Sequence, residues 1–259
     1  MSAAGLSLSV VMPCLNEESN AADAVRATLG AFDSAGISGE IIVVDDGSSD
    51  RTRAIAEELV LRDRRVRLIH HETPKGIGSS FWDGVLASSM SCVTLIPGDN
   101  ENEPREAMTY LPLCRHVDIV VPFVCNAEVR SKMRRIISSV YRFIVNFSFG
   151  TNLNYTNGTV IYNTDVLKEI TLYSKGFFYQ TELLIRLIRS GYLYAEVPYF
   201  LKERRMGITK ALSLKSLRVV MAGYFKLMWD VHIIRKFGQM NQRLNPVSAT
   251  YRRIHSVER

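Results

Sequence analysis

Two apolar runs that each end abruptly in acidic residues constrain the fold of this chain more than any other feature. The first is SVVMPCLNEE at residues 9–18, and the second is EIIVVDDGSSD at residues 40–50. An apolar run bounded by carboxylates is typical of a buried parallel strand whose carboxyl end opens onto a ligand crevice. Two such strands in succession predict an α/β fold with a binding site at one edge of the sheet.

The amino-terminal half continues this alternation of apolar runs with amphipathic helical patterns. Strands are expected at residues 6–12, 40–45, 66–70, 92–96 and 118–122. Helices are expected between them, at residues 21–35, 52–62, 79–89 and 104–111. This rhythm indicates βαβ units and predicts a doubly wound, mostly parallel sheet with helices on both faces.

The carboxyl-terminal half departs from this rhythm and carries most of the positive charge. Further elements are expected as helix 131–149, strand 160–162, helix 179–190, strand 193–198 and helix 214–237. The chain has 259 residues and a formal net charge of +6, so we expect one main domain, residues 1–212, and an appendage, residues 213–259. The basic half indicates a phosphate-bearing partner, and the last amphipathic helix suits a membrane surface about as well as its own domain.

The cysteines and two adjacent histidines show no metal-site spacing. The cysteines, which lack C-x-x-C spacing, are Cys14, Cys92, Cys114 and Cys125. We expect them to be reduced core residues of a cytosolic protein. His70 and His71 have no zinc-like partner spacing and are expected at the surface.

Membrane-spanning and leader segments are not expected. Residues 1–5 are too short and uncharged for a signal peptide. No stretch reaches the roughly 20 uninterrupted apolar residues of a spanning helix. The sequence therefore predicts a cytoplasmic protein that can touch a bilayer without crossing it.

The acidic strand ends indicate a nucleotide site. Carboxylates accept hydrogen bonds from ribose hydroxyls or a nucleobase N–H edge, and a divalent cation between carboxylates can hold a diphosphate. Asp46 is interpreted as a ligand, and Ser49 or Asp50 as the cap of the helix that begins near residue 52. In the alternative, Asp45 and Asp46 only begin a turn, and Ser48, Ser49 or Asp50 is the cap. Residues 98–104 read GDNENEP, a run of oxygen donors that suits Mg²⁺ or Mn²⁺, or else a polar loop capping the next helix.

Other candidates lie outside the strand ends. Glu182 is either a general base or a carboxylate favoured by the helix dipole in a first turn. Arg204 and Lys210 either fold over the substrate and neutralise a leaving diphosphate or form a solvated basic loop. Residues 75–80 read KGIGSS, which lacks the spacing of a phosphate-binding loop, so these glycines are expected to permit a tight helix entry.

Six short motifs occur in order between residues 6 and 212. They are MPCLNEE (12–18), VVDDGSSD (43–50), KGIG (75–78), YQTEL (179–183), Gly191 with EVP (196–198), and RRMGITK (204–210). Together they resemble family 2 glycosyltransferases of the dolichyl-phosphate mannosyltransferase type. The resemblance implies a GT-A fold, a nucleotide-diphosphate sugar donor, Mg²⁺ or Mn²⁺, and inverting transfer to a polyprenyl phosphate at the cytosolic membrane face. No nucleic-acid partner is expected.

The resemblance also assigns roles to the matched positions. Contacts to the nucleobase or ribose would come from Pro13, Leu15, Glu17, Val44 and Asp46. Contacts to the donor or acceptor phosphates would come from Arg204 and Lys210, and contacts to the lipid phosphate from Arg130 and Arg135. Two smaller departures are Leu15, where the family often has Tyr, and Asn154, near where it often has Asp.

One larger departure concerns the cation. The family usually has Asp-Ala-Asp after the fourth strand and Gln or Ser two positions later, whereas this chain has GDNEN. One alignment places Gly98 and Asn100 under the two aspartates and Asn102 under the third ligand. Shifting by one residue places Asp99 and Glu101 there. The shifted alignment keeps two anionic ligands, so we expect Asp99, Glu101 and Asn102 to hold the metal, and Gly98, Asp99 and Asn100 to lie against the donor.

The mechanism favoured by these assignments is a single displacement. The acceptor oxygen attacks the anomeric carbon from the face opposite the nucleotide, while metal, Arg204 and Lys210 stabilise the departing diphosphate. A phosphate acceptor is already anionic, so it makes Glu182 dispensable in principle. One alternative is transfer to a saccharide hydroxyl, which needs a base. Another is a non-catalytic nucleotide-sugar or membrane-binding module, whereas a dehydrogenase is disfavoured because no G-x-G-x-x-G follows the first strand.

Overall fold

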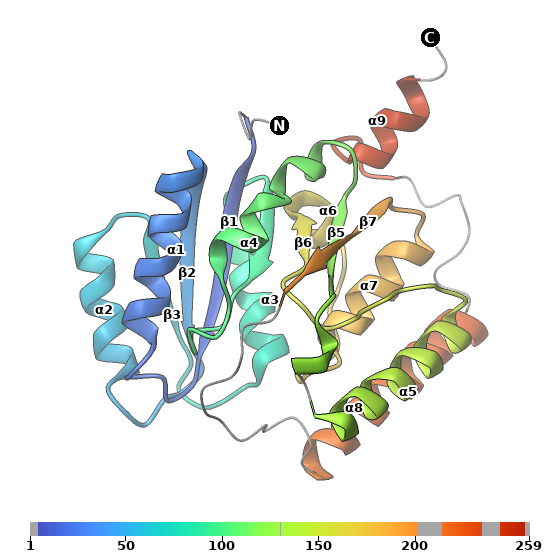
Figure 1. Ribbon diagram of the computed structural model, residues 1–259, viewed down its shortest axis with the longest axis horizontal. Helices are drawn as coiled ribbons and strands as arrows, with labels where there is room; N and C mark the ends of the chain where they lie inside the picture. Colours follow the sequence, from blue (N-terminus) through green and yellow to red (C-terminus); the bar gives the residue numbers. More distant parts are fainter. Residues whose placement is uncertain (1–4, 130, 201–213, 235–243, 257–259) are drawn as a thin grey trace.

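The computed structural model describes residues 5–129, 131–200, 214–234 and 244–256. Seven strands in this part of the chain form one sheet in the order β3-β2-β1-β4-β6-β5-β7 (Figure 1). The strands are β1 (Ser7–Cys14), β2 (Ser38–Asp45), β3 (Val66–His70), β4 (Cys92–Leu95), β5 (Ile119–Val124), β6 (Ile161–Asn163) and β7 (Tyr194–Tyr199). All neighbouring pairs are parallel except those of β6, which is antiparallel to β4 and β5. The expectation of a mostly parallel sheet is confirmed.

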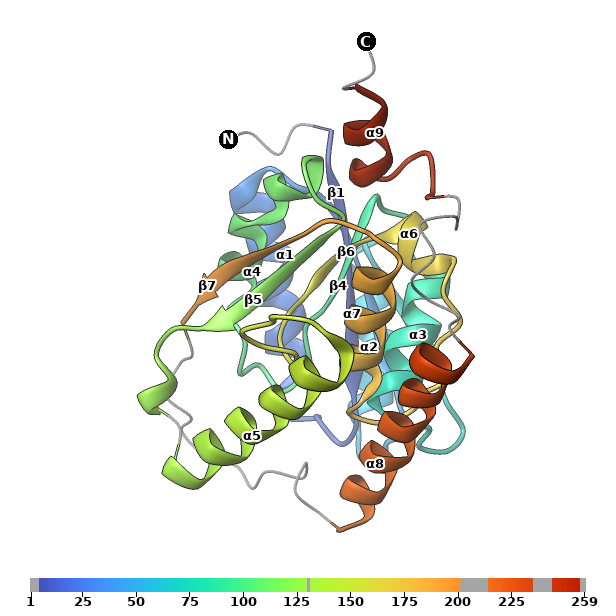
Figure 2. The ribbon, with the colours of Figure 1, turned by 90° about the vertical axis from the view of Figure 1, so that its right-hand side faces the viewer.

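Helices cover both faces of the sheet (Figures 1 and 2). One face carries α1 (Ala21–Ala35), α2 (Thr52–Arg62), α4 (Pro104–Thr109) and the 3₁₀ segment Leu111–Arg115. The other carries α3 (Ile77–Ala87), α5 (Lys132–Phe149), α6 (Thr164–Lys168), α7 (Tyr179–Arg189) and α8 (Leu214–Met228). A π-helical turn, Trp229–Ile233, follows α8, and the described elements also include the short 3₁₀ segment Ala127–Val129 and α9 (Ala249–Ser256).

Successive side chains of β1 contribute to two hydrophobic cores, one on each face of the sheet. Val10 and Met12 pack toward α1, whereas Val11 packs toward α3, because successive side chains leave a strand on opposite faces. A β-carbon at Gly84 of α3 would lie 2.3 Å from Cγ1 of Val11, so a glycine is needed where the helix meets the strand. The sheet is therefore buried on both faces, as the uninterrupted apolar runs predict.

Most expected elements lie within two residues of their observed bounds. Helices 21–35 and 52–62 and strand 66–70 have the bounds expected from the sequence. The last expected helix, 214–237, ends earlier, at Met228, and its final residues lie outside the described part of the chain. The sequence did not predict α6, α9 or the antiparallel direction of β6.

The segment after residue 213 packs against the main domain. Leu227 and Val231 are buried in the core on the α7 side of the sheet. Asp118 accepts hydrogen bonds from the backbone N–H groups of Ala249 (2.7 Å) and Thr250 (3.0 Å), which anchors the first turn of α9. The boundary that we expected between residues 212 and 213 falls at the edge of an undescribed segment and stays a prediction.

Two sequence expectations concern thiols and membrane spans. Cys14, Cys92 and Cys114 are buried free thiols as expected, but Cys125 is exposed just beyond β5, so the prediction of a core position was wrong for it. Within the described ranges, no helix combines the length and apolar character that a bilayer-spanning segment requires.

Candidate functional site

Hydrogen bonds tie the loop after β1 to the loop after β2. The N–H of Asn16 donates to Oγ of Ser48 (3.0 Å), and the N–H of Ser49 donates to Oδ1 of Asn16 (2.9 Å). The N–H of Glu17 donates to Oγ1 of Thr52 at the start of α2 (2.8 Å). Asn16 has a φ of 58°, a left-handed conformation that asparagine tolerates better than most residues. The carboxyl ends of β1 and β2 therefore form one connected edge, as predicted.

The residues expected to contact the nucleoside lie along this edge. Pro13 is paired with Val44 in the register of β1 and β2. Leu15 and Glu17 are half-buried in the loop that follows β1. Val44 is fully buried between β1 and β3, so it presents no exposed surface to a ligand in this structure. The structure brings these positions together with Asp46, and their contacts to a nucleoside stay predictions.

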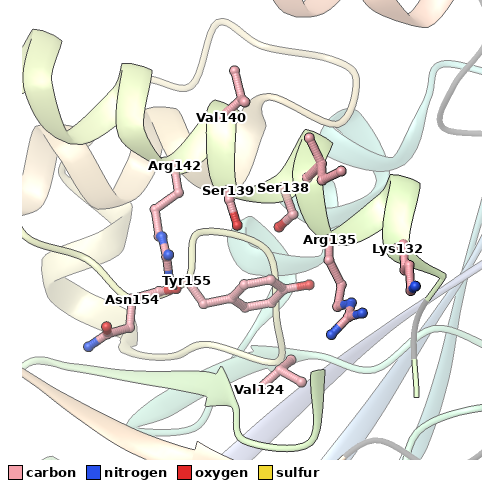
Figure 3. A pocket seen from close by; sticks show the side chains of 10 residues that line it. Val124, Lys132, Arg135, Ser138, Ser139, Val140, Arg142, Asn154 and Tyr155 are labelled. Atoms are coloured by element: carbon pink, nitrogen blue, oxygen red, sulfur yellow. Dashed lines mark hydrogen bonds between the residues drawn. The ribbon is translucent and has the colours of Figure 1, made fainter. Parts of the chain in front are cut away.

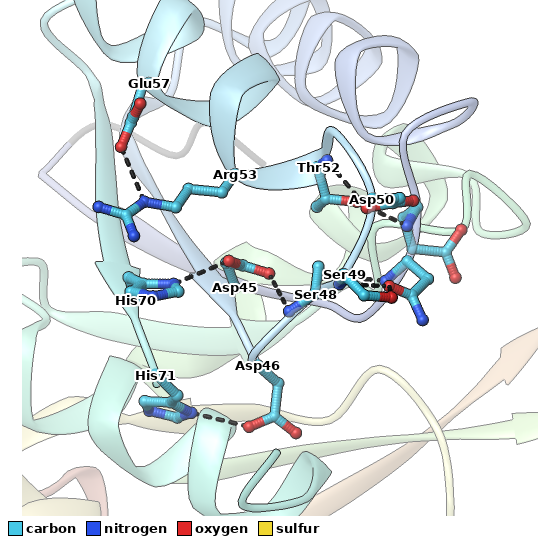
Figure 4. Close-up of polar contacts among 12 residues, drawn as sticks. Asp45, Asp46, Ser48, Ser49, Asp50, Thr52, Arg53, Glu57, His70 and His71 are labelled. Atoms are coloured by element: carbon cyan, nitrogen blue, oxygen red, sulfur yellow. Dashed lines mark hydrogen bonds and ion pairs between the residues drawn. The ribbon is translucent and has the colours of Figure 1, made fainter. Parts of the chain in front are cut away.

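Asp45 and Asp46 leave the end of β2 in opposite directions (Figure 4). Asp45 accepts hydrogen bonds from the N–H of Ser48 (3.1 Å) and contacts Nδ1 of His70 (2.9 Å), so it shapes the turn. Farther along the loop, Oδ1 of Asp50 accepts the N–H of Thr52 (2.9 Å). Asp50 thus satisfies a free N–H of the first turn of α2, as expected of a capping residue, although it stands one residue before the helix N-cap.

Asp46 is held by three donors on the α3 side of the strand end. Its Oδ1 lies 2.7 Å from Nδ1 of His71 and accepts the N–H of Lys75 (2.8 Å), while Oδ2 accepts the N–H of Gly76 (2.9 Å). His71 is buried, so the prediction of a surface position was wrong. The sequence carried no signal for this burial, because the ring lies between Asp46 at the end of β2 and Asp83 of α3, which only the tertiary structure brings together.

The glycines at residues 76 and 78 serve close packing. A β-carbon at Gly78 would lie 2.4 Å from the carbonyl oxygen of Ser174, and Gly76 has a φ of 97°. The N–H groups of Gly78 (2.8 Å) and Ser79 (3.3 Å) both donate to the carbonyl of Lys175. These contacts confirm the prediction that the two glycines let the chain enter α3 in close packing. The N–H groups of Gly78 and Ser79 both bond to a main-chain carbonyl.

Gly98 lies against the carboxyl end of β1. Its N–H donates to the carbonyl of Pro13 (3.1 Å), and a β-carbon at Gly98 would lie 2.3 Å from Sγ of Cys14. Burial first, and then the charges of nearby carboxylates that include Asp99, raise the pKa of Cys14 to about 12. A neutral thiol therefore occupies the space that a side chain at position 98 would need.

This packing leads to a stability prediction for Gly98→Ala. We expect a loss of about 1–3 kcal/mol in the free energy of unfolding, because the added methyl group overpacks the site beside Cys14. Urea denaturation measures the change. In a Cys14→Ala background the same substitution should cost much less, since the sulfur is gone. Equal losses of stability in both backgrounds would show that the sulfur of Cys14 is not the reason for a glycine at position 98.

The loop after β4 holds the expected cation ligands in one tight turn. Oδ1 of Asp99 accepts the N–H of Glu101 (3.1 Å), and Asn100 has a φ of 56°. Oδ1 of Asn102 accepts the hydroxyl of Tyr199 at the end of β7 (3.5 Å). Across the described residues, no three His, Cys, Asp or Glu side chains form a group suited to a metal ion.

This donor set fits a cation that is shared with a diphosphate. Mg²⁺ in nucleotide sites commonly takes only one or two protein carboxylates and completes its shell with phosphate oxygens and water. Asp99 and Glu101 supply two carboxylates within one turn, and Asn102 adds an amide oxygen. Their assignment as metal ligands stays a prediction.

Glu182 is buried within α7, where both carboxylate oxygens have partners. They accept the N–H groups of Tyr173 (3.1 Å) and Ser174 (2.9 Å). The guanidinium of Arg186 lies 3.0 Å from Glu182 and 3.2 Å from Asp230, in the turn after α8. Glu182 therefore joins α7 to the segment before it and, through Arg186, to the end of α8. These contacts support a structural role, and its role as a base stays untested.

A cavity of about 640 Å³ lies between α5 and the end of β5 (Figure 3). Cationic and apolar side chains share its lining, among them Lys132, Arg135, Arg142, Ile136, Val140 and Tyr155. The described lining residues include no carboxylate. Arg135, which the resemblance assigned to a lipid phosphate, is therefore part of a formed cavity. Arg130, Arg204 and Lys210 lie outside the described residues.

The sequence is similar to a known family and to characterised relatives. The model of the family described as Glycosyl transferase family 2 matches residues 9–171. Polyprenol monophosphomannose synthase of Mycolicibacterium smegmatis is 30% identical over 214 residues, covering 78% of this chain and 79% of that protein. Undecaprenyl-phosphate mannosyltransferase of Micrococcus luteus is 28% identical, covering 77% and 85% respectively.

The fold is similar to that of solved structures. Glucosyl-3-phosphoglycerate synthase from Mycobacterium tuberculosis in complex with uridine diphosphate superposes with a TM-score of 0.67 at 22% identity, covering 87% of this chain and 81% of that chain. The same enzyme with Mn²⁺, UDP-glucose and phosphoglyceric acid gives 0.66 at 21% identity, with the same coverage. At this level of identity the likeness shows a shared fold.

Proposed function

The chain belongs to glycosyl transferase family 2, and from that premise we propose that it transfers a sugar from a nucleotide-diphosphate sugar to a polyprenyl phosphate. It has a GT-A fold and is a glycosyltransferase. The names of the two relatives, a polyprenol monophosphomannose synthase and an undecaprenyl-phosphate mannosyltransferase, support this acceptor class. A GDP-sugar or a UDP-sugar is the proposed donor.

The cavity beside α5 is the observation that carries this proposal. Lys132, Arg135 and Arg142 bring three cationic groups to a space that Ile136 and Val140 also line. Guanidinium groups suit a phosphate, and the apolar side chains suit the first isoprene units attached to it. A saccharide hydroxyl carries no charge for these cations to neutralise, so the lining favours an anionic lipid acceptor.

In the proposed reaction the acceptor phosphate oxygen attacks the anomeric carbon from the face opposite the nucleotide. A new carbon–oxygen bond forms as the bond to the donor diphosphate breaks, with inversion at that carbon. Asp99, Glu101 and Asn102 would hold Mg²⁺ or Mn²⁺, which when bound neutralises charge on the diphosphate. Arg204 and Lys210 are proposed to stabilise the same departing group. Because the acceptor is already anionic, no base is required and Glu182 is not needed as one.

Mass spectrometry of reaction products tests the proposal. The protein would be incubated with Mn²⁺, a panel of GDP- and UDP-sugars, and either short polyprenyl phosphates or free saccharides. We expect a glycosylated polyprenyl phosphate and the released nucleoside diphosphate. A product formed only on the saccharides would instead establish transfer to a hydroxyl. Absence of any product, together with absence of Mn²⁺-dependent nucleotide binding, would favour a non-catalytic module.

Two helices present an apolar surface that fits a membrane. In α5 the exposed large apolar residues are Met133, Ile136, Ile137, Val140, Phe143, Ile144 and Phe147. In α8 and the turn after it they are Leu217, Val219, Met221, Phe225, Trp229 and Ile233. Both helices lie at the end of the sheet away from α2 (Figure 1). They meet at the C-terminal end of α5, where Oγ of Ser148 lies 2.6 Å from the hydroxyl of Tyr224, and they diverge from there (Figure 2).

The charges on α5 and α8 favour an anionic bilayer as the partner of this surface. Neither helix contains an acidic residue, and both carry Lys and Arg beside their apolar faces. Such helices lie in the interface of a bilayer with the apolar side inserted and the basic groups at the headgroups. We propose that the protein is a peripheral protein on the cytosolic face of a membrane. Insertion of α5 would then bring the cavity close to the lipid acceptor in the bilayer.

Vesicle co-sedimentation tests this membrane surface. Phe147 is 81% exposed, and we expect Phe147→Ser to weaken binding to anionic phospholipid vesicles about tenfold, because an aromatic side chain no longer inserts. Leu61→Ser is the matched control, since Leu61 is 87% exposed on α2, across the sheet. If both variants bind like the unaltered protein, α5 does not insert.

A further inference from the structure

We infer that His71 is a positioning residue that orients Asp46 for the nucleoside of the donor. The inference rests on the proposed nucleotide site and assigns a role within it to a residue outside the motifs. His71 follows β3, lies beneath the strand-end edge, and has a side chain only 2% exposed. Its effect on a ligand would pass through Asp46, which it contacts at 2.7 Å.

The contacts of Asp46 leave it little spare hydrogen-bonding capacity. An ionised carboxylate has about four acceptor positions, two on each oxygen. Oδ1 uses both of its positions, for His71 and for the N–H of Lys75, and Oδ2 uses one, for the N–H of Gly76. About one acceptor position on Oδ2 is left for a nucleoside N–H or hydroxyl. These three donors therefore determine the direction in which Asp46 can bind a ligand.

The ring nitrogen of His71 that faces away from Asp46 also contacts a carboxylate. Nε2 lies 2.9 Å from Oδ2 of Asp83, and the ammonium group of Lys75 lies 3.6 Å from the same oxygen. The ring of His71 is therefore held between the carboxylates of Asp46 and Asp83, so it cannot turn without losing one of the two contacts.

A comparison with the neighbouring His70 shows why this role is assigned to His71. His70 contacts Asp45 at 2.9 Å, but its side chain is 23% exposed and Asp45 shapes the turn (Figure 4). In contrast, Asp46 is the strand-end carboxylate that the motifs assign to the nucleoside. Removing His71 would leave one oxygen of Asp46 short of a donor, and the carboxylate could then rotate away from the direction that suits a ligand. Preorganisation of this kind improves binding by reducing the ordering that binding requires.

Isothermal titration calorimetry in the presence of Mn²⁺ tests the role of His71, with UDP, GDP and inorganic pyrophosphate as probes. We expect His71→Ala to weaken binding of whichever nucleotide the unaltered protein prefers by about tenfold. Pyrophosphate binding should be unchanged, because it lacks the nucleoside. His71→Asn should recover most of the affinity, since its amide N–H can replace the donor at Nδ1.

Two further variants separate positioning from a general loss of structure. His70→Ala should bind nucleotide like the unaltered protein. Asp83 is 37% exposed, so Asp83→Asn should fold and should weaken nucleotide binding by a few fold through the ring of His71. The inference is wrong if His71→Ala binds nucleotide normally, or if pyrophosphate binding falls to the same extent. Failure of the unaltered protein to bind either nucleotide would overturn the proposed function as well.

Discussion

Asp99→Asn is expected to lower the rate of sugar transfer about a hundredfold or more. Asp99 is the carboxylate proposed to hold the divalent cation, and charge stabilisation by such a cation contributes several kcal/mol to the transition state. The asparagine can still accept the N–H of Glu101 that Oδ1 of Asp99 accepts at 3.1 Å, so the turn should be preserved. The rate would be measured at saturating nucleotide sugar over a range of Mn²⁺ concentrations.

Matched variants in the same loop distinguish the two possible alignments of the cation ligands. If the shifted alignment is correct, Glu101→Gln should also lower the rate. Asn100→Gly removes a predicted donor contact but no cation ligand, so at saturating nucleotide sugar it should lower the rate much less. Glycine suits position 100 because Asn100 has a φ of 56°. A larger loss in Asn100→Gly than in Asp99→Asn would instead support the other alignment, in which Gly98 and Asn100 stand under the two aspartates of the family.

Arg186→Met is expected to lower the free energy of unfolding by about 3–5 kcal/mol. Arg186 is the buried cation between Glu182 (3.0 Å) and Asp230 (3.2 Å), and all three side chains are at most 8% exposed. Methionine keeps most of the side-chain volume but leaves two carboxylates without their cation. Urea denaturation monitored by circular dichroism measures the change, provided that the m-value stays constant.

An exposed ion pair of the same spacing supplies the control. Arg53 and Glu57 on α2 are also four residues apart, at 2.9 Å, but both side chains are more than half exposed. Arg53→Met should cost less than about 1 kcal/mol, because water already solvates its partner. Similar costs for the two substitutions would mean that burial does not strengthen the contacts of Arg186.

The same contacts change how the role of Glu182 must be tested. A glutamine at position 182 would place an amide N–H among the donors from Tyr173, Ser174 and Arg186, so it would destabilise α7 whether or not Glu182 is a base. A lower transfer rate in Glu182→Gln therefore counts as evidence for a base only if the urea midpoint is unchanged. An unchanged rate would favour the phosphate acceptor.

Much of the fold was predictable because the relevant signals are local in the sequence. Apolar runs such as residues 9–14 and 40–45 mark buried parallel strands, and the helical patterns between them predict crossovers. The direction of β6 was not predictable. A strand of three residues has the same side-chain pattern in either direction, and its neighbours β4 and β5 determine how it pairs.

The candidate site was predictable to a similar degree. The carboxyl ends of parallel strands must meet at one edge, so the neighbourhood of Pro13, Val44 and Asp46 followed from the strand assignments. The hydrogen-bond partners of Asp46 and Glu182 could not be predicted from the strand assignments. His71 reaches Asp46 from 25 residues farther along the chain. The N–H groups of Tyr173 and Ser174 reach Glu182 from the segment before α7, and Asp230, from the turn after α8, is joined to Glu182 through Arg186.

The sequence by itself determined which residue types stand at the strand ends, and with them the family and the class of chemistry. Only the tertiary structure decided which carboxylates are enclosed by donors and which line the edge. Asp45 and Asp46 are adjacent in the chain, yet one shapes a turn and the other faces α3 beside His71. The physical reason is that burial and hydrogen-bond partners depend on how distant segments pack, whereas strand and helix periodicity is written within each segment.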